Sequence, residues 1–336
     1  MILKQLIIEN WKSIVRIELN KLNPFSVYVG PNASGKSNIF EALEYIVMHA
    51  HQYEVERFFG GPESFVNRKQ VGENRILRIN LILENFPIEL GKTFSFKNDE
   101  VQTTSSQYIG LPSYFRRKDE DLIENRVEYR QFFQNFSKIF IGNHQSEKIA
   151  FEDDSKLSSA GGNLEKVLKR ILKDENKRKE IVEWLQLLIP GFENLEVKSE
   201  ELSGTDSLLI YEKDTDKPFP KSLISDGTYN ILALLTAAYQ SDKPQFLLIE
   251  EPENGLNPKV VQELVNLFRY RCEDYGDYIW LNTHSQTLVK QLTEKEIIVV
   301  EKADGETEVK QLSNGKTYGL PMDEAWLTNT FGGIPW

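Results

Sequence analysis

The chain has 336 residues and a net charge of −11, with 40% hydrophobic and 27% charged residues, a composition typical of a globular protein. The negative charge excludes attraction of nucleic acid by the whole surface, so DNA contact would need a local basic patch. No apolar run approaches the roughly 20 residues that span a bilayer, and the first residues lack a signal-peptide layout. The single cysteine, Cys272, excludes an internal disulfide and fits a reducing compartment. We therefore expect a cytoplasmic protein without a membrane segment.

The first third of the chain combines strand and helix patterns around one glycine-rich turn. Alternating apolar residues predict strands at residues 6–8, 14–19 and 25–29. The turn Gly30–Ser37 follows directly, and apolar residues spaced by 3.6 positions then predict a helix that ends near residue 50. A further strand is expected over residues 75–84. Together these elements form a predicted amino-terminal lobe over residues 1–98.

The middle of the chain, residues 99–192, is predicted to be a short helical arm inserted between two lobes. One helix is expected to carry on one face Leu122, Tyr129, Phe133, Phe136 and Phe140. Two more helices are expected from the apolar sets Leu164, Val167, Leu168 and Ile171, and Ile181, Leu185 and Leu188. No heptad pattern continues over several turns, so we expect no long coiled coil.

The last third alternates strands and helices again, which predicts a mainly parallel sheet covered by helices. Strands are expected at residues 208–211, 246–250, 278–282 and 297–300, and helices at 226–240 and 258–272. These elements form a predicted carboxy-terminal lobe, residues 193–301. The remaining tail, residues 302–336, ends in aromatic residues that we expect either to pack on their own domain or to dock a partner. The predicted fold class is α/β.

Gly30-x-x-x-x-Gly35-Lys36-Ser37 matches the phosphate-binding P-loop pattern, between a predicted strand and a predicted helix. A chance match is expected in roughly one chain in a hundred. The glycines let backbone N–H groups and the helix amino terminus face an anion. Lys36 is expected to contact the β- and γ-phosphates of ATP, and Ser37 to ligate Mg²⁺. The expected nucleotide contacts of the loop are Gly30, Asn32, Ala33, Ser34, Gly35, Lys36, Ser37 and Asn38.

Two adjacent carboxylates, Glu250 and Glu251, stand at the end of a predicted buried strand. Alone, such a pair is usually a solvated sheet edge. After a P-loop, we expect Glu250 to hold Mg²⁺ and Glu251 to act as the general base that activates the attacking water. His284 follows the strand predicted to neighbour the acidic one, where it could contact a γ-phosphate. The expected catalytic residues are therefore Lys36, Glu251 and His284.

The order of four segments resembles that of ABC-type ATPases: Gly30–Ser37, Ser225-Asp226-Gly227-Thr228, Leu248–Pro252 and Thr283-His284-Ser285. More narrowly, the chain is similar to the branch that holds SMC proteins, RecF, and the ATPase parts of OLD-like and abortive-infection proteins. The resemblance covers roughly residues 1–90 and 160–301. It implies a P-loop ATPase head with an antiparallel β subdomain and a short helical arm insertion.

The resemblance also implies a homodimer in which two copies enclose ATP and Mg²⁺. Ser225 and Gly227 would open a signature helix that binds the γ-phosphate held by the other copy, whereas the residues alone indicate only that Ser225 is a helix N-cap. Lys12 lies in an aromatic–basic–serine segment that is near the nucleotide in this branch. The glutamine-bearing loop of the family has two candidates, Gln52 and Gln70.

Several positions depart from the pattern of the transporters in this class. Asp226 and Thr228 stand where transporters carry glycine and glutamine, and Glu250 and Asn257 each replace the usual aspartate. These departures leave the turnover rate open and are compatible with a slow ATPase.

Three functions compete on this basis. The first is an ATP-driven dimer switch that controls a separate effector, a nuclease or toxin, as in the bacterial antiphage-defence ATPases that the chain resembles. The second is a RecF- or SMC-like DNA-repair ATPase, and the third is a P-loop kinase. Against a kinase stand the two-acid strand end and the absence of an arginine-rich lid. An OLD-type nuclease domain would need more than the 35 residues after Glu301, so we expect any cleavage to be done by another polypeptide.

DNA binding by this chain would depend on two groups of basic residues. Residues expected on one face of a helix are Lys166, Lys169, Arg170, Lys173 and Lys177, and Arg116-Arg117-Lys118 form a second cluster. About two times in three such a stripe is only a solvated face. The alternative is that the stripe follows a phosphate backbone or docks an acidic partner.

Overall fold

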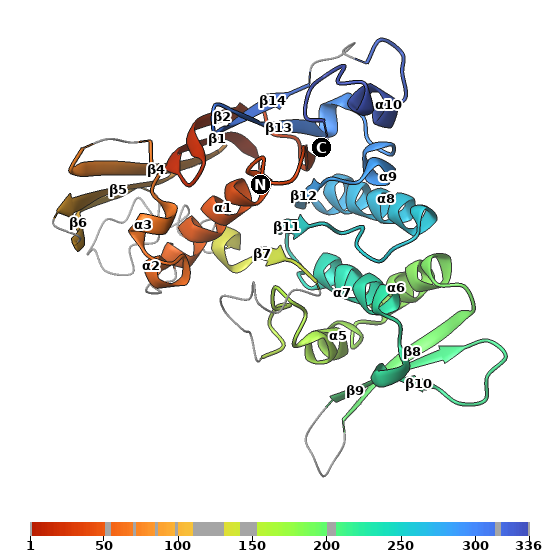
Figure 1. Cartoon of the computed structure of the whole chain (residues 1–336). Coiled ribbons are helices and arrows are strands. Elements are labelled where there is room, and N and C mark those ends of the chain that lie inside the picture. The colour runs from red at the N-terminus through yellow and green to blue at the C-terminus, as the bar shows by residue number, and fades with distance from the viewer. Residues whose placement is uncertain are drawn as a thin grey trace.

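The computed structural model describes residues 2–50, 55–69, 72–84, 87–97, 100–109, 131–141, 153–199, 206–312 and 317–334. Its centre is a six-stranded sheet built from segments far apart in the sequence (Figure 1). In order across the sheet, the strands are β14 (Glu306–Gln311), β13 (Ile297–Ala303), β3 (Phe25–Val29), β12 (Tyr278–Thr283), β11 (Phe246–Glu250) and β7 (Phe136–Ile139). All neighbours pair in parallel except β13 and β14, which form an antiparallel hairpin.

The central strands are buried on both faces, as their unbroken apolar runs predict. Leu247 and Ile249 of β11 belong to the core shared with α7 (Asp226–Tyr239) and α8 (Pro258–Tyr275). Phe246 and Leu248 point the other way, into the core shared with α1 (Lys36–Ala50). Because successive side chains of a strand alternate between faces, one apolar run completes two cores. The expected mainly parallel, covered sheet is thus confirmed.

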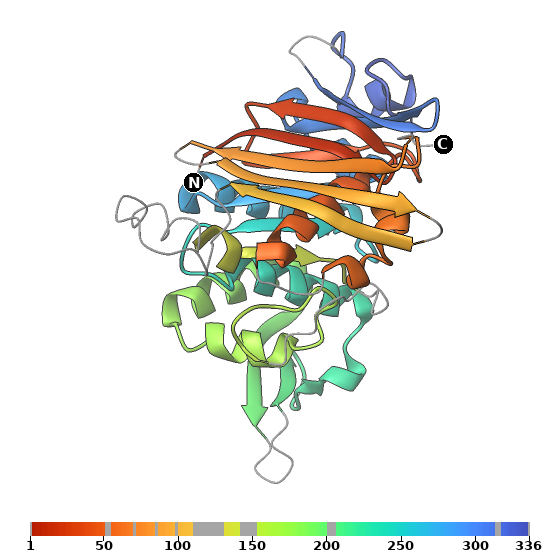
Figure 2. The same cartoon turned by 90° about the vertical axis from the view of Figure 1, so that its left-hand side faces the viewer.

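An antiparallel sheet lies over the α1 side of the central sheet, and Figure 2 shows it crossing the molecule as a broad layer. Its strand order is β2 (Ile14–Asn20), β1 (Leu3–Trp11), β4 (Asn74–Leu83), β5 (Pro87–Lys97) and β6 (Glu100–Ile109). Trp11 is fully buried against the rings of Tyr45 in α1, of Phe59 directly after the short helix α2 (Val55–Phe58), and of Phe65 in α3 (Pro62–Phe65). β6 lies inside the segment predicted as the helical arm, yet it is the edge strand of this sheet.

The expected helix through Phe133, Phe136 and Phe140 is wrong from Phe136 onward. Residues 131–134 are helical, but Phe136–Ile139 forms β7, which pairs in parallel with β11. The aromatic spacing fits both structures, and the strand wins because Phe136 pairs with Phe246 and their rings lie 5.6 Å apart, edge to face. Leu122 and Tyr129 lie outside the described residues.

The remaining helices of the middle segment are confirmed. They are α5 (Leu164–Ile171) and α6 (Glu175–Leu188), whose first turn is capped by the Asp174 side chain. Both pack against α7, and they carry a small sheet that projects from the molecule in Figures 1 and 2. Its strands are β8 (Phe192–Ser199), β9 (Asp206–Glu212) and β10 (Phe219–Pro220), and the 3₁₀ turn η3 (Lys221–Leu223) leads on to α7.

The tail packs on its own domain. Trp326 of α10 (Met322–Leu327) is fully buried, and its indole Nε1 donates a hydrogen bond to the Gly333 carbonyl. Phe331 is also buried in the core that includes α9 (Gln286–Val289). The partner-docking expectation is therefore wrong for these two aromatic residues, because neither is accessible; Trp336 lies outside the described residues. In the described part of the chain no helix has the length and apolarity to span a membrane.

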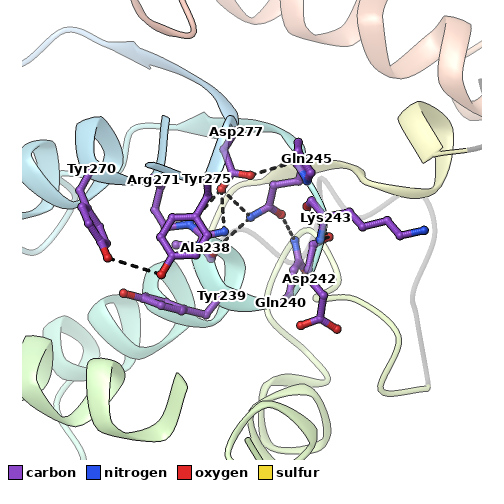
Figure 3. Close-up of polar contacts among 12 residues, drawn as sticks. Ala238, Tyr239, Gln240, Asp242, Lys243, Gln245, Tyr270, Arg271, Tyr275 and Asp277 are labelled. Atoms are coloured by element: carbon purple, nitrogen blue, oxygen red, sulfur yellow. Dashed lines mark hydrogen bonds and ion pairs between the residues drawn. The ribbon is translucent and has the colours of Figure 1, made fainter. Parts of the chain in front are cut away.

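A buried polar network ties together the carboxyl ends of α7 and α8 and the starts of β11 and β12 (Figure 3). Arg271 of α8 pairs with Asp277 over 2.8 Å, and both side chains are almost inaccessible. Asp277 also accepts a hydrogen bond from the Gln245 N–H, and Gln245 Nε2 donates to the Ala238 carbonyl of α7. The Arg271 guanidinium lies 3.8 Å from the Tyr275 ring centre. The network thus fixes the starts of β11 and β12, the strands whose carboxyl ends carry Glu250 and Asn282.

Candidate nucleotide-binding site

The P-loop connects β3 to α1 and needs glycine at both fixed glycine positions of its pattern. A Cβ at Gly30 would lie 2.0 Å from the Val300 carbonyl oxygen, and one at Gly35 would lie 2.0 Å from Thr307 Oγ1. Gly35 also has φ of +105°, a conformation that side chains rarely adopt. Because α1 begins at Lys36, the loop surrounds a helix amino terminus. This is the arrangement that binds phosphate groups.

The side chain of Lys36 is held inside the loop by backbone carbonyl groups of the loop. Its Nζ donates hydrogen bonds to the Gly30 and Pro31 carbonyl oxygens, each over 2.8 Å, and only 8% of the residue is exposed. Burial lowers the pKa of Lys36, although nearby carboxylates, chiefly Glu251, act in the opposite direction. The ammonium is therefore partly desolvated, and anionic phosphate oxygens would be better partners for it than carbonyl groups.

A chain of hydrogen bonds supports the loop from outside. Asn38 Nδ2 donates to Ser13 Oγ over 2.7 Å, Ser13 Oγ lies 2.6 Å from Thr307 Oγ1, and Thr307 Oγ1 donates to the Ser34 carbonyl over 2.8 Å. Asn38 and Ser34 were expected to contact nucleotide, and the structure places both in this support. Thr307 was not predicted, because it lies in the segment expected to be a tail and carries no motif.

Lys12 is directed toward α1. Its Nζ forms an ion pair with Glu41, and its backbone N–H donates to the Phe65 carbonyl over 2.6 Å. The neighbouring Ser13, rather than Lys12, joins the hydrogen bonds around the P-loop. A direct contact between Lys12 and nucleotide therefore stays a prediction.

Ser37 and Glu250 meet where the P-loop faces the end of β11. Ser37 Oγ donates to Glu250 Oε2 over 2.7 Å, and Asn282 Nδ2 donates to the same oxygen over 3.2 Å. The other oxygen, Oε1, pairs with Lys138 Nζ of β7 over 2.7 Å. Burial acts to raise the pKa of Glu250, but Lys138, Ser37 and Asn282 outweigh it and keep the pKa below its ordinary value. Glu250 is therefore ionised at neutral pH.

The residues at this point fit a magnesium ion. Among the described residues no group of three or more His, Cys, Asp or Glu side chains could hold a metal by itself. Magnesium, however, is commonly held by one or two protein oxygens together with substrate phosphates and water. Ser37 and Glu250 supply oxygen donors of that kind beside the P-loop. Their expected role as Mg²⁺ ligands stays a prediction.

Asn282 and Lys138 were missed by the sequence analysis. Asn282 pairs with Glu250 across β12 and β11, so a polar residue at the end of a predicted neighbouring strand was the available signal. Lys138 belongs to a strand that was predicted as helix, so its position beside Glu250 had no sequence signal.

The structure brings Glu251 and His284 together. Glu251 Oε1 lies 3.3 Å from His284 Nδ1, and Oε2 accepts a hydrogen bond from Asn254 Nδ2 over 2.9 Å. The backbone of Glu251 has φ of +49°, and its N–H donates to the Asn282 carbonyl. This strained turn directs the carboxylate away from Glu250, although the two residues are adjacent. Both Glu251 and His284 remain partly exposed, as groups that must reach water and phosphate should be.

Glu253 is a partly buried carboxyl group that no motif singled out. Oε1 accepts a hydrogen bond from Thr283 Oγ1, whereas Oε2 is buried without a hydrogen-bond partner. Burial raises the pKa of Glu253 to about 7. Thr283 Oγ1 also accepts from the Ser285 N–H over 2.9 Å. Glu253 thus connects the turn after β11 with the His284 segment.

Ser225 is the N-cap of α7, as the residues alone predicted. Its Oγ accepts a hydrogen bond from the Thr228 N–H over 3.2 Å, and the residue is exposed. Nearby, Asn230 Nδ2 donates to the Asn254 carbonyl over 3.0 Å, so the start of α7 is joined to the turn that follows Glu251. A Cβ at Gly227 would approach the Gly255 carbonyl to 3.0 Å. The exposed amino terminus of α7 is available to a second molecule.

The expected basic stripe does not lie on one helix. α5 ends at Ile171, and Lys177 lies on α6, where it pairs with Asp242. Lys169 pairs with Asp206 over 2.7 Å, and Arg170 donates to three backbone carbonyl groups. These bonds hold neighbouring segments of the chain together. The single-helix prediction is wrong, because the basic residues are divided between α5, α6 and the turn that joins them. The cluster Arg116-Arg117-Lys118 and both glutamine-loop candidates, Gln52 and Gln70, lie outside the described residues.

Fold and site together define a P-loop protein with the fold of an ABC-type ATPase head. The family model described as "AAA domain, putative AbiEii toxin, Type IV TA system" matches residues 25–290, more than half of the chain. The chain belongs to this family. The expected ABC-type ATPase head fold is confirmed by the solved SMC heads that share it. A search of curated proteins found no match.

Three solved structures share the fold. An SMC head bound to the C-terminal winged-helix domain of ScpA has a TM-score of 0.61 at 16% identity and covers 95% of this chain and 100% of its own. The SMC head domain from Thermotoga maritima has a TM-score of 0.52 at 14% identity, covering 93% and 100%. An SMC head with an extended coiled coil, bound to the C-terminal domain of ScpA from Pyrococcus furiosus, has a TM-score of 0.59 at 15% identity, covering 93% and 96%. At such identities the likeness concerns the fold alone.

Proposed function

We propose that this chain binds ATP with Mg²⁺ and hydrolyses it to ADP and phosphate. The observation that carries the proposal is the convergence of Ser37, Glu250 and Asn282 beside the P-loop that contains Lys36. With a nucleoside triphosphate in the loop, Lys36 would exchange its two carbonyl partners for phosphate oxygens. Ser37 and Glu250 would hold Mg²⁺, which would neutralise part of the phosphate charge.

Glu251 is the proposed general base. Its carboxylate is held between His284 and Asn254, so it can be oriented toward a water molecule in front of a γ-phosphate. His284 then contacts the γ-phosphate and links it to Glu251. Departure of the γ-phosphate after hydrolysis would remove the contact with His284, which makes His284 a sensor of the nucleotide state.

Two copies of the chain close on ATP in this proposal. Ser225 and Gly227 begin α7 at an exposed helix amino terminus, and a phosphate held by another copy would satisfy its free N–H groups. Because α7 is joined to the turn after Glu251 through Asn230 and Asn254, closure and chemistry are physically connected. ATP would close the dimer, and hydrolysis would open it.

The biological role that we propose is control of a separate effector, a nuclease or toxin, in bacterial antiphage defence. The family description, which names a toxin of a type IV toxin–antitoxin system, supports a role in defence. The partner-bound SMC heads support a head that passes its state to another protein. The DNA-repair alternative has less support, because Lys169, Arg170 and Lys177 are occupied by internal contacts.

The direct test is phosphate release by the purified chain, compared with binding of a fluorescent ATP analogue. We expect Mg²⁺-dependent release in the parent and none in Glu251→Gln, with nucleotide still bound by that variant. Release by Glu251→Gln at the parent rate would remove Glu251 as the base. Absence of both binding and release in the parent would overturn the proposed function.

A further inference from the structure

Lys138 is a buried cation in direct contact with the proposed metal-binding carboxylate. It lies on β7, the edge strand beside β11, and pairs with Leu248 across the two strands. Its Nζ is 2.7 Å from Glu250 Oε1 and 3.4 Å from Glu44 Oε2, and only 9% of its side chain is exposed. An ammonium group seldom stands so close to a carboxylate that is expected to hold a divalent cation, because the two cations repel each other.

The contacts divide the two oxygens of Glu250 between different partners. Oε1 faces Lys138, whereas Oε2 faces Ser37 and Asn282. The side chain is therefore fixed at both oxygens, and the oxygen beside Ser37 is the one presented to the P-loop. Lys138 thus holds one of the two oxygens of Glu250 in place before any nucleotide arrives.

Lys138 also offsets the charge of Glu250. A free Mg²⁺ ion that approaches Ser37 and Glu250 would meet a carboxylate already paired with an ammonium group, which it shares with Glu44, and a second ammonium, Lys36, lies in the adjoining loop. Burial keeps solvent and salt from screening this repulsion fully. An ATP molecule carries several negative charges on its phosphates, which would restore the attraction for the metal.

We propose that Lys138 is a positioning residue that orients Glu250 and makes divalent-cation binding at Ser37 and Glu250 dependent on the nucleotide. The proposal rests on the proposed function as an ATP·Mg²⁺ site. Glu44 has a part in it, because it keeps a carboxylate beside Lys138 from the α1 side when Glu250 turns toward a metal. ATP and metal then enter together, and the empty site keeps its shape without an ion.

The test measures Mn²⁺ binding by electron paramagnetic resonance, with and without a non-hydrolysable ATP analogue. The parent should bind Mn²⁺ weakly alone and tightly with the analogue. Lys138→Met removes the charge but keeps an unbranched chain, and it should raise the affinity of the nucleotide-free protein for Mn²⁺ about tenfold or more. Lys138→Arg keeps the charge and should behave as the parent. Lys92→Met, which removes a buried ammonium paired with Glu56 rather than with Glu250, is the matched control and should show no gain.

The outcomes separate this inference from the function on which it rests. If Lys138→Met and the parent bind Mn²⁺ equally without nucleotide, while both bind it tightly with the analogue, the role of Lys138 is refuted and the ATP site stands. If the parent gains no Mn²⁺ affinity from the analogue, the proposed ATP·Mg²⁺ site itself is refuted. Lys138→Gln, which keeps a donor for Glu250 without the charge, gives the same comparison should Lys138→Met fail to fold.

Discussion

Asn282 Nδ2, at the end of β12, donates a hydrogen bond to Glu250 Oε2, at the end of β11, over 3.2 Å. The same amide lies 3.5 Å from Ser37 Oγ, and the Asn282 carbonyl oxygen accepts the Glu251 N–H over 3.0 Å. One side chain and its backbone thus connect the metal-binding residues with the proposed general base. The parallel pairing of the two strands produces this contact, because it brings their carboxyl ends to the same edge of the sheet.

Asn282→Ala tests this connection. The substitution removes a donor from the carboxylate expected to hold the metal, and losses of about 10- to 100-fold in metal affinity or activity are usual for supporting residues of that kind. We expect phosphate release to need a higher Mg²⁺ concentration for half its maximal rate. Circular dichroism should show unchanged folding. An unaltered Mg²⁺ titration would show that Asn282 does not support Glu250.

Lys36→Ala tests the P-loop. The variant lacks the ammonium that the Gly30 and Pro31 carbonyl groups hold in the loop, so it cannot neutralise the β- and γ-phosphates. Binding of a fluorescent ATP analogue should be abolished. Undiminished binding would exclude this loop as the phosphate site. Lys12→Ala is a useful companion, because its partner is Glu41 and a loss of nucleotide affinity there would reveal a contact absent from the structure.

Glu253 predicts a dependence of stability on pH. Burial raises its pKa to about 7 in the folded chain, above the ordinary value of a glutamate, so the folded state binds the proton more tightly. The stability it contributes is full below its unfolded pKa and is lost as the pH rises through about 7. Glu253→Gln should remove this loss. The free energy of unfolding of the variant minus that of the parent should therefore increase by up to about 3 kcal/mol between pH 4.5 and pH 8. Parallel pH curves from urea unfolding would contradict the assignment.

Arg271→Leu tests the buried polar network at the starts of β11 and β12. Removal of the guanidinium leaves Asp277 buried without its ion partner, and breaking such a pair typically costs about 3–5 kcal/mol. Urea unfolding should show this loss. The double variant Arg271→Leu with Asp277→Asn should recover part of it, because no uncompensated charge remains. Equal stability of the parent and the single variant would mean that the pair contributes nothing.

The parts predicted from sequence are those governed by local pattern. The P-loop turn, the buried strand 246–250 and the N-cap at Ser225 each depend on a few adjacent residues with one dominant conformation. Strand β7 could not be predicted in this way, since its aromatic spacing also fits a helix and only pairing with β11, more than 100 residues later, decides between them.

The missed site residues have the same explanation. Lys138 lies beside Glu250 only because β7 is a strand, and Thr307 supports the P-loop only because β14 returns along the sheet after β13. Neither residue carries a motif, and both contacts join distant segments. Glu253 followed a recognisable acidic strand, but its raised pKa arises from burial against the His284 segment, which sequence alone does not show.

In the proposed cycle, ATP joins two copies of this chain. The most direct measurement is the molar mass of Glu251→Gln by light scattering, with ATP and Mg²⁺ and again with ADP. We predict twice the chain mass with ATP, a single chain with ADP, and a single chain under both conditions when Lys36→Ala is added. A single-chain mass for Glu251→Gln saturated with ATP would contradict the account.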